Sequence, residues 1–163
     1  MKVNAQIRYP ASCEKVFAML LDRSFQEQVC EATGALRHEV QIEQVDGAAV
    51  ITTRRELPTD DIPDYARGFV GTTLDVVRVD RWEAPAADGS REGTISLEIK
   101  GAPIRLHGTL GLRPDDAGCE EAIAGDLKAS IPLLGGKMEK AAEPALMSAI
   151  RKEEQVGLLH LGG

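Results

Sequence analysis

Histidine is the side chain best suited to proton transfer near neutral pH and a common metal ligand, and this chain has three histidines. His38, His107 and His160 lie on separate predicted elements, without the short His-His or Glu-His spacings of metal-binding helices. The sequence therefore predicts no metal site and no cofactor. His107 shares the solvated face of a predicted strand with Arg105. His38 falls on an apolar strand face, either as a core residue or as a proton-transfer group.

Nucleophilic catalysis has no clear candidate in the sequence. No Gly-x-Ser-x-Gly motif is present. The cysteines, Cys13, Cys30 and Cys119, are odd in number and scattered, which favours neither a disulfide framework nor a zinc site. We expect reduced thiols in a cytoplasmic protein. No catalytic residue is assigned.

The charged run Arg54-Arg55-Glu56 lies in a predicted strand, so one of its two arginines must face the covered side of the sheet. A buried arginine needs a carboxylate, which Glu56, Asp75 or Glu153 could supply. Such a pair is either a polar anchor inside an apolar pocket or a salt bridge at the rim. The possible polar anchors are Arg54, Glu56, Asp75 and His38.

The elements that position these residues begin with a strand over residues 3–9, followed by two short helices that end near Ala32. Six further strands are expected over residues 36–43, 49–57, 73–82, 94–100, 104–112 and 120–131. Short turns such as Asp46-Gly47 make neighbouring strands antiparallel. A helix from Gly135 to about Leu161 is the one element long enough to cover the apolar face. Pro144 either kinks it or starts a new helix.

Four local features accompany this order: Arg81-Trp82, Gly101-Ala-Pro103, Gly108-Thr-Leu-Gly-Leu, and Ile131-Pro-Leu-Leu-Gly-Gly-Lys-Met-Glu139. The order resembles the START-like (SRPBCC, helix-grip) superfamily, which includes Bet v 1-like proteins and polyketide cyclases, and the local features resemble its DUF2505 family. The resemblance implies one α+β domain over residues 1–163. In it, a curved antiparallel sheet of six to seven strands wraps a long C-terminal helix, with two short helices after the first strand. It also implies a cavity for an apolar ligand, but no transferable activity.

The predicted C-terminal helix carries small side chains on its inward stripe. The stripe consists of Met138, Ala142, Ala145, Leu146, Ala149, Ile150 and Glu153. Alanines here, with Gly157, are compatible with close packing on the sheet or with a pocket. Gly135-Gly136 and Lys137 at the start of the helix are either a tight turn or a phosphate cradle.

If the space is a pocket, apolar side chains from the strands and the helix line it. The predicted lining is Phe69, Leu74, Val76, Trp82, Leu97, Leu106, Leu110, Leu127, Met138, Leu146, Ala149 and Ile150. The segment 58–72, rich in Pro, Gly and Asp, is the candidate gate or a plain crossover. Aromatic residues make up only 4% of the chain, which is consistent with unfilled volume.

The overall charge narrows the class of partner. The net charge is −7 with no basic stripe, which disfavours nucleic acid and anionic membranes. No apolar run is long enough to span a bilayer. Three functions stay open: a carrier or sensor of a small apolar, lipid- or polyketide-like molecule, a cyclase- or hydratase-type enzyme, and a protein-interaction module. For the enzyme, His38, Glu56 and Asp75 are the candidate acids or bases.

Overall fold

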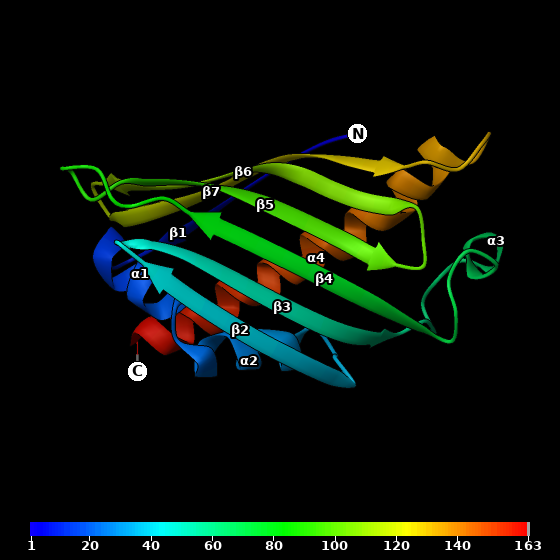
Figure 1. The fold of residues 1–163 in the computed structure, drawn as a ribbon, viewed down its shortest axis with the longest axis horizontal. Coiled ribbons are helices and arrows are strands. Elements are labelled where there is room, and N and C mark those ends of the chain that lie inside the picture. Colours follow the sequence, from blue (N-terminus) through cyan, green and yellow to red (C-terminus); the bar gives the residue numbers. More distant parts are fainter. Residues whose placement is uncertain (163) are drawn as a thin grey trace.

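A computed structural model describes residues 1–162 and contains one antiparallel sheet of seven strands in the order β1-β7-β6-β5-β4-β3-β2. The elements are β1 (Lys2–Tyr9), α1 (Cys13–Leu20), α2 (Arg23–Ala32), β2 (Arg37–Val45), β3 (Ala48–Pro58), α3 (Asp64–Arg67), β4 (Thr73–Trp82), β5 (Arg91–Lys100), β6 (Ile104–Asp115), β7 (Gly118–Ala129) and α4 (Gly135–Gly162). Figure 1 shows α4 crossing behind the sheet, with α1 at one end, α2 along the β2 edge and α3 at the other end. The predicted helix-grip order is confirmed.

Local signals in the sequence explain where the elements begin and turn. The Ser12 hydroxyl accepts a hydrogen bond from the Lys15 amide and caps α1. Asp22 caps α2 in the same way through the Ser24 amide. Asp46 and Gly47 both have positive φ, the geometry of a two-residue hairpin turn, and join β2 to β3.

Helix α4 runs without interruption through Pro144. Its first residue, Gly135, sits so close to β7 that an added Cβ would lie 2.5 Å from the Ala129 carbonyl oxygen. The close approach explains why this position is a glycine and agrees with the first of the two interpretations, a tight turn into the helix. The prediction of one helix to about Leu161 is confirmed, but Ala145, placed on the inward stripe, is exposed.

The C-terminal half of α4 packs tightly against the rest of the fold. The helix has its backbone neighbours in α2, β7, β1 and α1. At Gly157 an added Cβ would lie 2.6 Å from Tyr9 Cε1 and 2.8 Å from Tyr9 Oη. The absence of a side chain at this position therefore lets the Tyr9 ring, 1% exposed, lie against the helix.

Two cysteines differ from the sequence-based expectation. Cys13, at the start of α1, forms a disulfide with Cys119 in β7, with a Cα–Cα distance of 5.0 Å. Cys30 is a buried free thiol. The prediction of reduced thiols is wrong for Cys13 and Cys119, because the fold brings together residues 106 apart in the sequence. The cysteines consequently give no support to the predicted cytoplasmic location.

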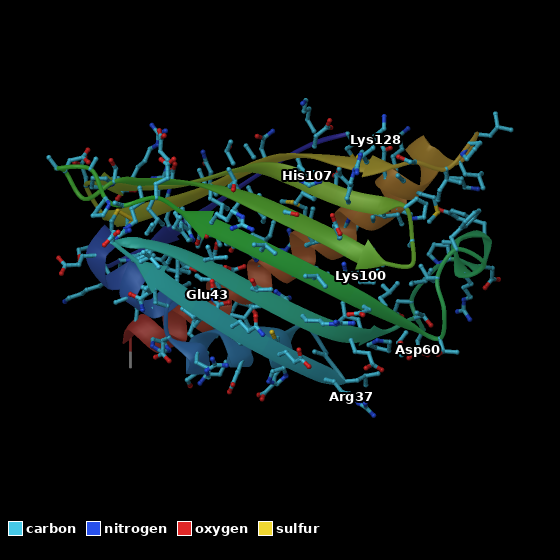
Figure 2. The ribbon with its side chains drawn as sticks, viewed as in Figure 1. Arg37, Glu43, Asp60, Lys100, His107 and Lys128 are labelled. Carbon is cyan, nitrogen blue, oxygen red and sulfur yellow. A yellow bond between two sulfur atoms is a disulfide. The ribbon has the colours of Figure 1, made fainter. Side chains whose placement is uncertain are left out.

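The outer face of the sheet is polar. Figure 2 shows His107 on β6 and Lys128 on β7 on this face, away from α4. Arg54 and Asp75 form an ion pair here, with Arg54 Nε 2.8 Å from Asp75 Oδ1. Glu56 lies directly opposite Asp75 in the β3–β4 register, so it shares this face. The predicted solvated position of His107 is confirmed.

Candidate ligand site between the sheet and helix α4

A small cavity lies between the inner face of the sheet and α4. Its volume is about 20 Å³, which is room for roughly one water molecule. The lining residues are Val3, Arg78, Ile95, Leu97, Leu106, Ile123, Gly125, Leu146 and Ile150. All are apolar except Arg78, and they come from β1, β4, β5, β6, β7 and α4. The enclosed space is thus apolar with one cationic group in its wall.

Packing changes along the length of the sheet–helix interface. At the end near α1, the inward residues Ala49, Trp82 and Leu112 are almost completely buried. Toward α3, inward apolar side chains are only half-buried. These are Leu57, Leu74, Val76, Leu97 and Ile99 from the strands, and Ala142, Leu146 and Ala149 from α4. The two interpretations of the alanine stripe therefore apply to different halves of α4: close packing at Gly157 and looser packing around Leu146.

Arg78 connects β4 to α4 through two carboxylates. Its Nε donates to both Asp80 carboxylate oxygens at 2.9 and 3.1 Å, and its Nη1 donates to Glu153 Oε2 at 2.8 Å. Burial lowers the pKa of Arg78, but the charges of Asp80 and Glu153 outweigh burial and raise it well above its ordinary value. Arg78 is therefore a fixed cation whose long side chain spans the space between sheet and helix.

Glu121 and Tyr9 form a second polar group beneath α4. Glu121 is 1% exposed, and burial, followed by the nearby charge of Glu153, raises the pKa of its carboxyl well above the ordinary value. Burial also raises the pKa of the Tyr9 phenol, with Glu121 and Glu153 adding to the effect. Burial therefore favours the protonated, uncharged form of both side chains.

Several buried polar atoms on the inner face have no hydrogen-bond partner among residues 1–162. They are Tyr9 Oη, Thr53 Oγ1, Arg55 Nε, Trp82 Nε1 and Glu121 Oε2. Each such atom costs about 1–3 kcal/mol when it stays unpaired. All five belong to inward-facing strand positions, so the interior between sheet and helix is richer in polar groups than the apolar alternation suggested.

The arginine pair of β3 divides between the two faces, as predicted. Arg55 points inward and its Nη1 donates to Thr33 Oγ1 at 3.2 Å, while burial lowers its pKa. The prediction of a carboxylate partner is wrong for Arg55, because α2 ends beside it and supplies the Thr33 hydroxyl. Arg54, by contrast, forms the outer-face pair with Asp75.

The four predicted polar anchors have mixed positions. Arg54, Glu56 and Asp75 face outward, so they are wrong as anchors and as pocket acids or bases: strand alternation turns them away from α4. His38 is half-buried on edge strand β2, opposite Arg55 in the register.

The twelve predicted apolar residues lie in three settings. Leu97, Leu106, Leu146 and Ile150 line the cavity. Trp82, Leu110, Leu127 and Met138 are buried in the core, and Phe69, Leu74, Val76 and Ala149 are half-buried. Their role in binding stays a prediction.

Sequence reasoning missed Arg78, Asp80 and Glu121 as inward-facing residues. Arg78 and Asp80 occupy alternate positions of β4 between Val76 and Trp82. Glu121 precedes Ile123 by two residues in β7. The period of two that placed their apolar neighbours inside also places these charged side chains inside.

The segment predicted as a gate contains the one-turn helix α3. The Arg67 guanidinium donates to the carbonyl oxygens of Ile62 and Asp60 and holds the segment together. The Lys137 ammonium lies 4.0 Å from the centroid of the Tyr65 ring, which connects the segment to the first turn of α4. The segment 58–72 thus lies at the loosely packed end of the interface between sheet and helix. Its role as a gate stays a prediction.

Within residues 1–162, no three His, Cys, Asp or Glu side chains are grouped to hold a metal ion. None of the helices in that range combines the length and apolar character needed to cross a bilayer.

The seven-stranded sheet wrapped on a long C-terminal helix is the START-type, helix-grip fold. A STAR-related lipid transfer protein from Xanthomonas axonopodis has the same fold, with a TM-score of 0.62 and 17% identity over 99% of this chain and 86% of that one. The di-domain ARO/CYC StfQ from the steffimycin biosynthetic pathway also matches, with a TM-score of 0.62 and 11% identity over 97% of this chain and 49% of StfQ.

The family model described as protein of unknown function (DUF2505) matches residues 4–160, and the chain belongs to this family. The uncharacterized protein Rv0481c of Mycobacterium tuberculosis is 25% identical over 112 residues, which is 68% of this chain. The match spans 64% of the length of that relative. The family assignment made from the sequence is confirmed.

Proposed function

We propose that the protein binds a small apolar molecule between the sheet and α4 and acts as its carrier or sensor. The observation that supports the proposal most directly is the apolar cavity together with the half-buried apolar side chains that continue from it toward α3. Apolar surface left partly exposed on an inner face favours occupation by an apolar ligand. The fold shared with a lipid transfer protein agrees with this use.

The cavity of about 20 Å³ is smaller than any such ligand, so binding requires α4 or the α3 segment to move. The middle of α4 is the part able to do so, because Leu146 and Ala149 are only half-buried, whereas Gly135 and Glu139 hold its first turns to β7. The C-terminal half is fixed by Gly157 against Tyr9 and by the Arg78–Glu153 pair. Entry is therefore expected beside α3.

The first test is native mass spectrometry of the protein purified from its own host, followed by denaturing extraction. A co-purifying apolar molecule supports the proposal and identifies the ligand class. In parallel, octane is added to the purified protein, and a rise in melting temperature reports binding. If no molecule co-purifies and octane leaves the melting temperature unchanged, the proposal fails and the inner face is simply a loosely packed core.

A matched pair of variants locates the site. Leu146→Phe adds volume to the cavity wall and is expected to abolish the response to octane. Leu159→Phe makes the same change on the same helix at a position that is 78% exposed, and the response should remain. If octane raises the melting temperature of both variants equally, octane binds outside this cavity.

An enzyme of the cyclase or hydratase type is the second candidate. One observation favours it: Glu121 is a buried acid whose raised pKa is typical of catalytic groups. The fold shared with the di-domain ARO/CYC StfQ agrees with it. The test is incubation of ligand-free protein with the extracted molecule. Turnover predicts a change in the chromatographic retention of that molecule, with a change in its mass where water is added or lost, and Glu121→Gln should prevent the change.

A further inference from the structure

Glu121 and Tyr9 occupy neighbouring inward positions of two paired strands. Glu121 lies opposite Ile7 of β1 and Leu112 of β6, and Tyr9 lies opposite Cys119. Both side chains are 1% exposed, and Glu121 Oε2 and Tyr9 Oη have no hydrogen-bond partner among residues 1–162. Their strand neighbours offer no polar side chain. Because an unpaired buried polar group is costly, an interior with two of them points to a partner from outside the chain.

The pair continues from the apolar cavity toward the C-terminal half of α4. Ile123, which lines the cavity, is the next inward residue after Glu121 on β7. Ile150, also in the lining, lies one helical turn before Glu153, whose charge raises the pKa values of both Tyr9 and Glu121. A molecule that fills the cavity with its apolar part would therefore direct its other end at Glu121 and Tyr9.

The charges around this inner end are already balanced. Arg78 is bonded to Asp80 and Glu153. The remaining buried cation, Arg55, lies on β3 beside α2, where it donates to Thr33. An anionic group at Glu121 would face the Glu153 carboxylate, and Arg78, the cation whose charge acts on Glu121, is already paired with two carboxylates, which makes desolvation of the anion expensive.

We infer that Glu121 and Tyr9 form the polar end of the ligand site and bind an uncharged hydroxyl or carbonyl group, so that the site selects neutral amphiphiles over anionic ones. This inference rests on the proposed function. A protonated carboxyl can both donate and accept a hydrogen bond, and a phenol can do the same. One hydroxyl or carbonyl oxygen can thus satisfy both side chains.

The experiment compares three probes of equal chain length on the purified full chain at pH 8. The probes are 1-octanol, octanoate and octane, and affinity is measured by calorimetry and by the shift in melting temperature. We expect 1-octanol to bind at least about tenfold more tightly than octanoate and octane, the factor that corresponds to one added hydrogen bond to a buried group.

Variants assign this preference to the two residues. Glu121→Leu should bring the affinities for 1-octanol and octane to within about threefold of each other, and Tyr9→Phe should weaken 1-octanol binding in the same direction. Glu92→Gln, at an exposed position of β5, is the control and should keep the full preference.

Each outcome separates this inference from the proposed function. If octane binds but 1-octanol binds no more tightly, or if octanoate binds best, the inference fails and the apolar site stands. If none of the probes binds, both fail. Infrared spectroscopy tests the protonation state of Glu121 without any ligand. A C=O band of a carboxylic acid at pH 8 that disappears in Glu121→Gln supports an uncharged Glu121. If the unmodified protein lacks this band at pH 8, Glu121 is ionised and the inference is overturned.

Discussion

Replacing Gly157 with alanine tests whether the C-terminal half of α4 is held in close contact with the sheet. Alanine normally stabilises a helix interior by about 1 kcal/mol relative to glycine. Here the new Cβ would lie 2.6 Å from Tyr9 Cε1, 2.8 Å from Oη and 3.0 Å from Cζ. The Tyr9 ring is buried and rigid, so it cannot move aside as the end of a flexible chain would.

The expected effect follows from two opposing contributions. Overpacking in a close-packed interior costs about 1–3 kcal/mol. Gly136→Ala in the first turn of the same helix is the matched control, because a Cβ there meets nothing within 4 Å. Comparing the two variants largely cancels the helix propensity. Gly157→Ala should therefore be less stable than Gly136→Ala by about 1–3 kcal/mol.

Denaturant unfolding followed by circular dichroism and by the fluorescence of Trp82, the single tryptophan, gives both free energies. In a Tyr9→Ala background the obstacle is gone, and Gly157→Ala should then stabilise the protein. Equal stability of Gly157→Ala and Gly136→Ala would refute the close contact, and with it the explanation of why only the other half of α4 is loosely packed.

Three further predictions concern charge and covalent structure. Because the folded pKa of Glu121 lies above the ordinary value of 4.5, the folded state holds this proton more strongly than the unfolded state, and stability is lost as pH rises above about 4.5. Glu121→Gln should therefore gain stability relative to the unmodified protein as pH rises from 5 to 8, by at most about 1.4 kcal/mol per pH unit; unfolding curves that keep a constant difference would contradict this. Replacing Cys13 and Cys119 together with serine should cost about 2–5 kcal/mol, and a reductant should weaken only the unmodified protein in the same unfolding assay. Arg54→Ala removes an exposed ion pair and should change the free energy of unfolding by less than about 1 kcal/mol, with octane binding unaltered; a large loss of either would place Arg54 in the site after all.

The fold was accessible from the sequence because its signals are local. Alternation with a period of two identified each strand, Asp46-Gly47 set a hairpin, and the periodic stripe from Met138 to Glu153 identified the final helix. Register between strands that follow one another through short turns is set by those turns and needs no long-range information. The pairing of β1 with β7 does need it, and so does the Cys13–Cys119 bond, which joins the helix after β1 to β7.

The polar interior of the site is harder to predict from the sequence, because the chemical type of a charged residue does not tell which face of its strand it occupies. Arg54, Glu56 and Asp75 looked like anchors because they cluster in sequence or carry charge, yet alternation turns them outward. The same rule places Arg78, Asp80 and Glu121 inward. Which of these would be paired could not be read from the sequence, because the pairing of Arg78 depends on a helix residue 75 positions later.

The arrangement of α4 follows from what each of its halves touches. The C-terminal half of α4 is fixed at two points. Gly157 packs closely against Tyr9, and Glu153 forms a buried ion pair with Arg78. Four residues earlier, Ala149 reaches neither contact and stays half-buried. Since Gly135 and Glu139 hold the first turns of the helix to β7, the loosely packed part is its middle, around Leu146 and Ala149. The Arg78–Glu153 pair is the C-terminal boundary of that part, and breaking it should extend the loosely packed region toward Tyr9. Arg78→Met, which keeps an unbranched apolar side chain but removes the charge, should leave the buried Asp80 and Glu153 carboxylates unpaired and lower the free energy of unfolding by about 3–5 kcal/mol. If Arg78→Met instead left stability unchanged, the pair would not be what holds the helix, and the division of α4 into a fixed C-terminal half and a loosely packed middle would have to be abandoned.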